Sequence, residues 1–425
     1  MVIGNPAHTD TQTKTLRPCR AELLAVLSHV LDYSSSGEVS HHARVAVLAA
    51  RMASHLRRVD RIDTFYAALL HDIGLAGEPR EPDGYWSLEE ESNRPVIRSH
   101  PLIGAQLTAT IPDWLGVAEI ILDHHECFNG HGYPRGKSGD EILPAAQILR
   151  FADTCDFALR EQAEPELISF LHAVRGRTAG QVHSSVADAG IEVLGEEGFY
   201  AQLLASKDVE LLLQSTIRRL APEDLMTTNA EVAALLELFG HVADAYHSDR
   251  TGHSRRVANL AVLVAMALGL ETQETTRIKW AALLHDIGMV AVPKSLLDKP
   301  GRLTSEDLDD AHRHIAAAEE FLALVHGLEE VASIVAAHGE AFDGSGYPQG
   351  LAGNEIPLGA RIIAVCNTFD ALTSRRPHRE ARHISLAIDI LVKGSGSLFD
   401  PDVVAAAIPA FLISQPAEEK QAAGI

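Results

Sequence analysis

The sequence His71-Asp72-Ile73-Gly74 returns as His285-Asp286-Ile287-Gly288, and Gly132-Tyr133-Pro134 returns as Gly346-Tyr347-Pro348. Both motifs recur with the same displacement (285 − 71 = 346 − 132), and the interval between them is therefore identical in the two copies. Self-similarity at a constant spacing is typical of a duplicated domain. The sequence therefore predicts two copies of one fold, which we call repeat one and repeat two.

Each repeat opens with apolar residues at helical spacing. They are Leu23, Leu24, Leu27, Val30 and Leu31 in repeat one, and Val232, Leu235, Leu236, Phe239, Val242 and Ala243 in repeat two. A second helical stretch follows in each copy, headed by the motif His-x-x-Arg-Val at 41–45 and 253–257. Alternating β-branched runs are scarce, and Gly and Pro gather in loops at 129–139 and 343–353. An all-α fold of two tandem helical bundles is expected.

The expected organisation follows from these repeats. A polar N-terminal segment (1–17) precedes repeat one (18–205), a helical connector (206–228) leads to repeat two (229–414), and a frayed tail (415–425) ends the chain. A length of 425 residues agrees with two large domains.

The composition restricts the partners and the compartment. With 36 Lys and Arg against 58 Asp and Glu, the formal charge is −22. Without a basic cluster, such a chain is not expected to bind a nucleic-acid polymer. The most apolar stretch, 257–270, falls short of the roughly 20 residues that cross a bilayer, and the four cysteines lack CxxC spacing. We expect a cytoplasmic protein without a membrane partner, and the sequence leaves a homodimer open.

A histidine followed directly by an aspartate places a neutral imidazole beside a carboxylate. Such a pair can ligate two adjacent divalent cations, with the aspartate bridging them. Further candidates in repeat one complete the predicted ligand set His41, His71, Asp72, His100, His124, His125 and Asp153. Five imidazoles and two carboxylates suit two ions of iron or manganese and also permit zinc or nickel, whereas magnesium prefers oxygen ligands.

The chemistry of such a centre indicates a reaction class. Two metals about 3.5–4 Å apart would activate a bridging water for in-line attack on phosphorus and take up charge on the phosphoryl oxygens. Hydrolysis of a phosphate ester is therefore predicted, with Asp72 and His71 as the catalytic residues acting through the bridging hydroxide.

The order of these motifs resembles that of the HD-GYP family of bacterial cyclic di-GMP phosphodiesterases. The resemblance covers His-x-x-Arg-Val, His-Asp-Ile-Gly, an intervening histidine, His-His-Glu, Gly-x-Gly-Tyr-Pro and Ala-Asp, and it extends over most of both halves. It implies helical domains of the HD type, a binuclear or trinuclear iron or manganese centre, and hydrolysis of cyclic di-GMP to the linear dinucleotide or to GMP. Many members carry an acidic residue four positions before the first histidine; Gly37 stands there, which favours two metals.

The same resemblance makes the two repeats unequal. Repeat one matches all seven metal ligands. In repeat two the matching positions are Asp249, His253, His285, Asp286, His314 and His338, followed by Gly339 and Asn367 where a histidine and an aspartate are expected. Glycine supplies no side chain and asparagine no negative charge. One residual metal could bind His253, His285 and Asp286, whereas a catalytic pair is not expected.

Phosphate-binding residues are distributed the other way. The run 370–379 in repeat two resembles the family pattern and includes Arg376 and Arg379, which suit a phosphate. Repeat one carries Gln162 and Pro165 at those positions, and both repeats lack the lysine expected after His-Asp-Ile-Gly. Arg135, Lys137, Arg150 or Arg160 are candidate substitutes in repeat one.

We therefore expect a metal-dependent phosphodiesterase that hydrolyses a cyclic dinucleotide, foremost cyclic di-GMP, in repeat one, with a regulatory or dimerising repeat two. Two alternatives stay open. The chain could be a non-catalytic cyclic-dinucleotide receptor or signalling scaffold, as the missing basic residues suggest. It could also hydrolyse another nucleotide or phosphoester, because the segments 75–98 and 289–313 differ.

Overall fold

A computed structural model describes residues 18–35, 40–78, 94–161, 166–220, 228–246, 250–297, 299, 304–375 and 381–413. The predicted segments 1–17 and 415–425 lie outside the described residues, as do the candidate ligand Asp249 and the candidate phosphate-binding residues Arg376 and Arg379.

The described residues form α-helices and short 3-10 helices without a β-strand, which confirms the predicted all-α fold. In the first half the helices are α1 (Arg20–Ser35), α2 (His41–His55), α3 (Arg61–Leu70), η1 (Ile73–Leu75), α5 (Pro95–Thr108), α6 (Leu115–Asp123), η2 (Gly139–Glu141), α7 (Pro144–Glu161), α8 (Leu167–Thr178), α9 (Ser184–Leu194), α10 (Phe199–Leu204) and α11 (Ser206–Leu220). In the second half they are α12 (Asn229–Tyr246), α13 (His253–Ala267), α14 (Thr272–Leu284), η3 (Ile287–Ala291), α15 (Lys294–Leu297), α16 (Ser305–Leu322), α17 (Glu329–Ala336), η4 (Gly353–Glu355), α18 (Leu358–Thr373), α19 (Ile384–Gly394) and α20 (Pro401–Ile413). None of the described helices is both long and apolar enough to cross a bilayer.

The two repeats share one order of elements. α2, η1 and α7 in repeat one, for example, correspond to α13, η3 and α18 in repeat two. His183 and His383 cap α9 and α19 in the same way, but the displacement between them is smaller than that between the two His-Asp motifs. Repeat one is thus longer than repeat two between α7 and the capping residue His183. Helix α8 lies in that segment.

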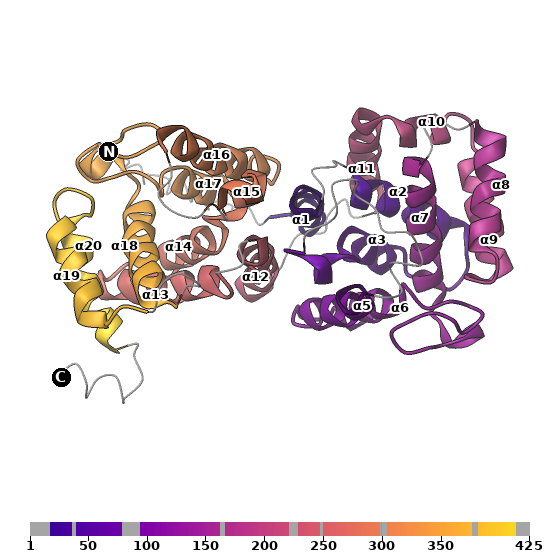
Figure 1. The fold of residues 1–425 in the computed structure, drawn as a ribbon, viewed down its shortest axis with the longest axis horizontal. Coiled ribbons are helices and arrows are strands. Elements are labelled where there is room, and N and C mark those ends of the chain that lie inside the picture. Colours follow the sequence, from indigo (N-terminus) through magenta and orange to yellow (C-terminus); the bar gives the residue numbers. More distant parts are fainter. Residues whose placement is uncertain are drawn as a thin grey trace, which may run out of the picture.

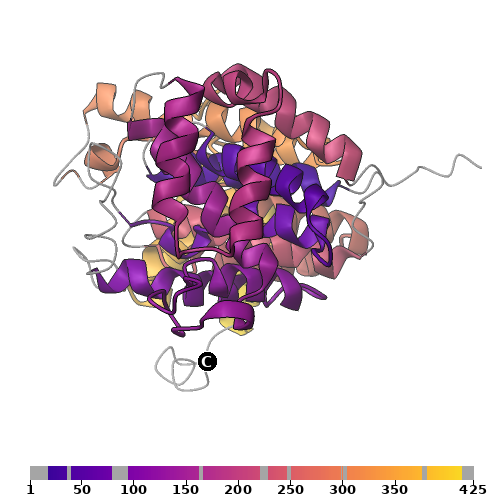
Figure 2. The same cartoon turned by 90° about the vertical axis from the view of Figure 1, so that its right-hand side faces the viewer.

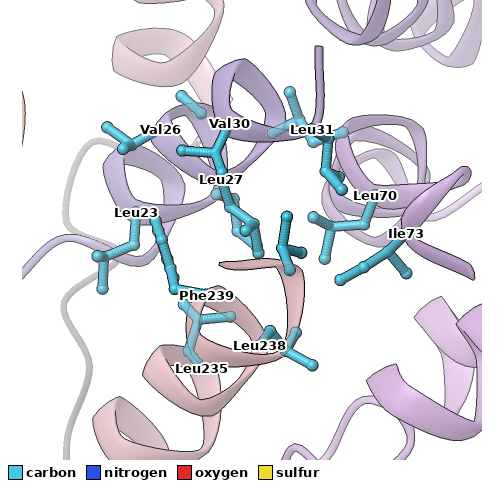
Figure 3. Packing of buried hydrophobic residues seen from close by; sticks show 14 of the residues in the cluster. Leu23, Val26, Leu27, Val30, Leu31, Leu70, Ile73, Leu235, Leu238 and Phe239 are labelled. Atoms are coloured by element: carbon cyan, nitrogen blue, oxygen red, sulfur yellow. The ribbon is translucent and has the colours of Figure 1, made fainter. Parts of the chain in front are cut away.

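Helices α1 and α12 pack against each other where the two repeats meet. They lie side by side at the centre of the molecule, between a bundle of indigo and magenta helices and a bundle of orange and yellow ones (Figure 1). Turning the molecule by 90° brings the first bundle in front of the second, so the two follow one another along the long axis (Figure 2). Leu23 and Leu27 of α1 face Leu235 and Phe239 of α12 in the same apolar cluster (Figure 3).

This junction is part of one continuous hydrophobic core. Buried residues from α1 to α20 belong to a single cluster that includes both repeats. Polar contacts surround it: Arg20 pairs with Glu231, and the Lys294 ammonium donates to the Gly77 carbonyl over 3.0 Å. Gly77 has a positive φ of 81°, and a Cβ there would lie 2.0 Å from the Ala245 carbonyl oxygen. The two repeats therefore contact each other through both apolar and polar residues.

Helix α11 occupies most of the predicted connector. Its buried residues Val209, Leu213 and Ile217 pack in the core, and the helix contacts α2. The reason is its amphipathic pattern, because apolar residues at intervals of four form a stripe that must be covered. This helix thus belongs structurally to the first bundle.

Candidate metal centre

The histidine of the first His-Asp motif stands directly after α3. Its Nδ1 donates to the carbonyl oxygen of Ala68 over 2.9 Å. The last carbonyls of a helix have no partner within the helix, so Ala68 can accept this bond. A neutral imidazole that donates from Nδ1 presents a bare Nε2, the form that ligates metals. The end of α3 thereby leaves Nε2 as the nitrogen of His71 that could bind a metal.

Two further histidines are also oriented by hydrogen bonds from Nδ1 to backbone carbonyls. Nδ1 of His100 lies 2.6 Å from the carbonyl of Ile97, and Nδ1 of His124 lies 2.6 Å from the carbonyl of Ile121 at the end of α6. Within α5, Pro101 has no N–H and so cannot donate to Ile97 four residues before it. The proline therefore frees the carbonyl that holds His100.

His41, the first residue of α2, is held by a carboxylate instead. Its Nδ1 lies 2.6 Å from Oδ2 of Asp156 on α7. Arg44 and Arg160 both pair with Asp156, which keeps this carboxylate charged although it is buried. A carboxylate behind a histidine orients the ring and raises its basicity toward a metal. The arginine of His-x-x-Arg-Val thus supports the histidine of the same motif.

His125 has a different environment. Nη1 of Arg150 donates to its Nδ1 over 2.6 Å, and Arg150 also donates from Nε to Gln181 over 2.9 Å. The ring of His125 stacks on Tyr133 of the Gly-Tyr-Pro motif, with centroids 4.8 Å apart and planes 14° apart. The Gly-Tyr-Pro loop therefore packs against the predicted ligands.

Asp72 lies between two groups of candidate ligands. Its Oδ2 lies 3.6 Å from Nε2 of both His41 and His71, and its Oδ1 lies 3.3 Å from Nε2 of His100. His124 and His125 complete the second group. Asp153 approaches the first group, with Oδ1 4.0 Å from Nε2 of His41 and 3.9 Å from Nε2 of His71. The five predicted histidine ligands of repeat one thus gather around Asp72, with Asp153 beside the first group.

The chemistry of this cluster fits cations. Nε2 of His100 and Nε2 of His124 face each other at 3.1 Å, although both rings donate from Nδ1 and so have no proton to share. Nε2 of His71 is buried without a hydrogen-bond partner. Burial lowers the pKa of His71 to about 4 and holds the pKa of His124 well below the ordinary histidine value. Neutral lone pairs converging in a buried place are stabilised when a metal binds between them.

Asp72 supplies the compensating negative charge. Burial would raise its pKa, but the neighbouring His71, His100 and His41 hold the pKa of this carboxyl well below its usual range. Asp72 is therefore ionised at neutral pH. An ionised Asp72 could ligate a divalent cation through either of its oxygens.

The repeated glycines allow close backbone contacts at the centre. A Cβ on Gly74 would lie 2.2 Å from the carbonyl oxygen of His100, and one on Gly132 would lie 2.2 Å from the amide nitrogen of Cys127. Their counterparts Gly288 and Gly346 have equally close backbone neighbours, at 1.9 Å and 2.1 Å. Gly74 permits η1 to pack on α5. Gly132 permits the Gly-Tyr-Pro loop to pack on Glu126 and Cys127, which follow His124 and His125.

Repeat two keeps part of the arrangement. Oδ2 of Asp286 lies 3.6 Å from Nε2 of His253 and 3.4 Å from Nε2 of His285, while His314 and His338 face each other at 3.3 Å between their Nε2 atoms. In addition, the guanidinium of Arg250 forms an ion pair with Asp286. A cation from the chain itself thus neutralises the carboxylate that corresponds to Asp72.

In repeat two an aromatic ring fills the space of the missing histidine. At Gly339 a Cβ would lie 2.8 Å from the Tyr347 ring, so this tyrosine occupies the space of the absent side chain. Tyr347 in turn stacks on His312, with centroids 3.5 Å apart. Asn367, at the position of Asp153, offers no charge. Repeat two therefore has fewer ligands and a different packing around them.

Four basic residues suggested as phosphate contacts in repeat one have partners within the chain. Arg135 and Lys137 pair with the fully buried Asp123, Arg160 pairs with Asp156, and Arg150 bonds to His125 and Gln181. Two residues were not among those predicted from the sequence: Asp156, which accepts from Nδ1 of His41, and Arg44, which pairs with Asp156. The available signal was the recurrence of Asp156 and Arg44 as Asp370 and Arg256, which form the same pair in repeat two.

We expect metal binding to repeat one to tighten as the pH rises. Burial lowers the pKa of His41, but the charge and hydrogen bond of Asp156 outweigh burial and raise this pKa to about 9. The metal-free protein therefore carries a proton on His41 at neutral pH, and a metal must displace it. Affinity should rise about tenfold per pH unit between about pH 7 and about pH 9 and then level off.

Calorimetric titration of metal-free protein with Mn²⁺ at several pH values measures this slope. Asp156→Asn removes the charge that raises the pKa of His41 and should flatten the slope. An affinity of the unaltered protein that is constant above pH 7 would contradict the role of the pair.

Comparison with known proteins identifies the family. The sequence matches the HD domain family over residues 25–165 and 237–403. It is 31% identical over 313 residues to 3′3′-cGAMP-specific phosphodiesterase 3 of Vibrio cholerae, covering 73% of this chain and 66% of that protein. It is 26% identical over 380 residues to 3′3′-cGAMP-specific phosphodiesterase 1 of the same organism, covering 86% and 85%.

Two further similarities complete the comparison. The cyclic di-GMP phosphodiesterase response regulator RpfG of Xanthomonas campestris pv. campestris is 44% identical over 151 residues, covering 35% of this chain and 40% of that protein. The chain thus spans less than two thirds of RpfG and of phosphodiesterase 3. The crystal structure of the cyclic GMP-AMP specific phosphodiesterase V-cGAP3 of V. cholerae shares the fold with a TM-score of 0.64 at 23% identity, covering 95% of this chain and 100% of that chain. The chain belongs to the HD-domain family, as a tandem pair of HD-GYP domains.

Proposed function

We propose that this chain is a metal-dependent phosphodiesterase that hydrolyses a cyclic dinucleotide in repeat one. The observation that carries the proposal is the position of Asp72, which faces two groups of imidazoles with its two oxygens. Divalent ions bound there, with iron or manganese preferred, would supply a nucleophilic water at neutral pH and neutralise the phosphodiester. Relatives named as phosphodiesterases support this reaction class.

The chain's own residues prepare the centre in three ways. Helix ends and Asp156 bind Nδ1 of the predicted ligands, so that Nε2 of His41, His71, His100 and His124 is the nitrogen left for a metal. Burial lowers the pKa of His71, His124 and His125 and keeps these rings neutral, and Asp72 stays ionised. The stacking of Tyr133 on His125 brings the Gly-Tyr-Pro loop beside the centre. Repeat two, with Arg250 on Asp286, serves in this proposal as a structural and regulatory partner.

Two substrates have support. The resemblance of the motifs favours cyclic di-GMP, and relatives named for that substrate match one repeat's length of this chain. The relatives that match most of this chain are named for 3′3′-cGAMP instead. The tandem arrangement therefore makes 3′3′-cGAMP the second candidate.

One experiment tests the reaction and compares the substrates. Protein purified without oxygen and loaded with Fe²⁺ or Mn²⁺ is incubated with cyclic di-GMP and with 3′3′-cGAMP, and products are separated by chromatography. We expect about two metals per chain and a linear dinucleotide or mononucleotides from at least one substrate. Tight binding of either nucleotide without product, at full metal loading, would favour a receptor; activity only on another phosphoester would overturn the substrate class.

A further inference from the structure

His42 is a buried histidine beside the predicted ligands that neither the motifs nor the proposed function uses. It is the second residue of α2 and only 1% exposed. Its Nδ1 lies 2.5 Å from Oδ1 of Asp32, a carboxylate that is equally buried. Its Nε2 is shielded from solvent and has no hydrogen-bond partner. An unpaired polar atom in the interior is costly unless a ligand satisfies it.

Nε2 of His42 lies near the predicted metal ligands. The ring of His42 lies 4.8 Å from that of His41 and 5.1 Å from that of His71, measured between centroids. One nitrogen of His42 lies within 4.8 Å of ligand atoms of His41, His71 and Asp72. Since Asp32 occupies Nδ1, the nitrogen available to a cation is Nε2.

Asp32 holds His42 as Asp156 holds His41. In each case a buried carboxylate accepts from Nδ1, and Nε2 points away from that carboxylate. Asp32 also accepts from the backbone N–H of Ser40, so it is anchored at the start of α2. A carboxylate of this kind orients a ligating imidazole and raises its basicity.

Repeat two provides an internal comparison. The residue that corresponds to His42 is Ser254, and the one that corresponds to Asp32 is Asp244, because both pairs have the same displacement (254 − 42 = 244 − 32). Asp244 accepts from the Ser254 backbone N–H at 3.2 Å and from its hydroxyl at 2.8 Å. The anchoring carboxylate is thus common to both repeats, whereas the additional imidazole occurs only where the predicted metal set is complete.

We propose that Nε2 of His42 is an additional metal ligand in repeat one, at the site formed with His41, His71 and Asp72. This inference rests on the proposed metal centre and adds a ligand that the family motifs do not contain. With Asp153 beside it, the site would have three imidazoles and two carboxylates, one imidazole more than the motif ligands His41, His71, Asp72 and Asp153 supply. Nitrogen ligands favour nickel, zinc and iron over manganese. His42 thereby tunes the metal preference of one of the two sites.

The test is His42→Asn. An asparagine amide can keep the hydrogen bond to Asp32 that Nδ1 makes, but it has no atom at the position of Nε2. Metal-free protein is titrated with Ni²⁺ and with Mn²⁺ by calorimetry, and the absorption spectrum of the Co²⁺ form is recorded. We expect at least about a tenfold loss of Ni²⁺ affinity, a smaller loss for Mn²⁺, and a changed Co²⁺ spectrum.

The controls separate the inference from the proposed function. His55→Asn removes a partly exposed histidine at the end of the same helix and should change neither affinity nor spectrum. His42→Ser, which copies Ser254, should reproduce His42→Asn and covers the case in which asparagine is not accommodated. If the unaltered protein binds no metal in repeat one, the proposed function fails. If it binds metal and both His42 variants bind Ni²⁺ as tightly with an unchanged Co²⁺ spectrum, only the role of His42 fails.

Discussion

Asp72→Ala should abolish hydrolysis of the cyclic dinucleotide and release metal from repeat one. The reason is that Asp72 is the carboxylate shared by both ligand groups, so its loss removes a ligand from each and the negative charge from between them. Loss of a hydrogen bond behind a ligand alone costs about 10–100-fold in metal affinity or activity, so removal of the shared ligand should cost more than about 100-fold. Turnover and metal content per chain measure the effect.

The matched variant is Asp286→Ala at the same position of repeat two. Arg250 already pairs with Asp286, and Gly339 and Asn367 replace two ligands there. We expect this variant to keep most of the activity and to bind metal in repeat one as before. The reverse pattern, with activity lost in Asp286→Ala and retained in Asp72→Ala, would assign catalysis to repeat two.

Gly74→Ala should both destabilise the fold and displace the predicted metal ligand His100. Its Cβ would lie 2.2 Å from the carbonyl oxygen of His100 and 2.9 Å from the amide nitrogen of Gly104. Both are backbone atoms of α5, so the helix must move away from η1. Overpacking of this kind costs about 1–3 kcal/mol or more, and we expect at least about 2 kcal/mol here. Denaturant unfolding of metal-free protein measures the stability, and calorimetry measures the metal affinity.

Two glycine variants serve as controls. Gly288→Ala should destabilise the protein by a similar amount, because its Cβ would lie 1.9 Å from the His314 carbonyl oxygen, but it should leave metal binding in repeat one unchanged. Gly176→Ala places a Cβ in open space within α8 and should be neutral or stabilising by up to about 1 kcal/mol. Stability of Gly74→Ala equal to that of Gly176→Ala would show that α5 does not pack as closely as described.

Much of the fold could be predicted because it depends on local patterns. The apolar stripe that begins at Leu23, the loops rich in glycine and proline, and the constant displacement between the two copies of each motif led to an all-helical tandem fold, which the structure confirms. The position of α11 could not be predicted in the same way. A stripe shows that a helix must be covered, but it does not show which helix covers it.

The clustering of the candidate ligands could be predicted from the sequence, but the residues that hold them could not. Histidines beside aspartates have a recognisable spacing, and the structure places the seven predicted residues together. The partners that orient them are distant in the sequence: Asp156 is 115 residues from His41. His42 was not proposed because a second histidine next to His41 has no distinctive spacing. Its contact with Asp32 becomes visible only when α1 and α2 pack.

The continuous core gives repeat two a structural role that does not depend on a metal site of its own. Leu23 and Leu27 on α1 are covered by residues of α12, so removal of repeat two would expose these side chains to water. A repeat of this kind covers the apolar surface of its neighbour whether or not it binds a metal. The two repeats are therefore better regarded as one packed unit than as one domain with a detachable accessory.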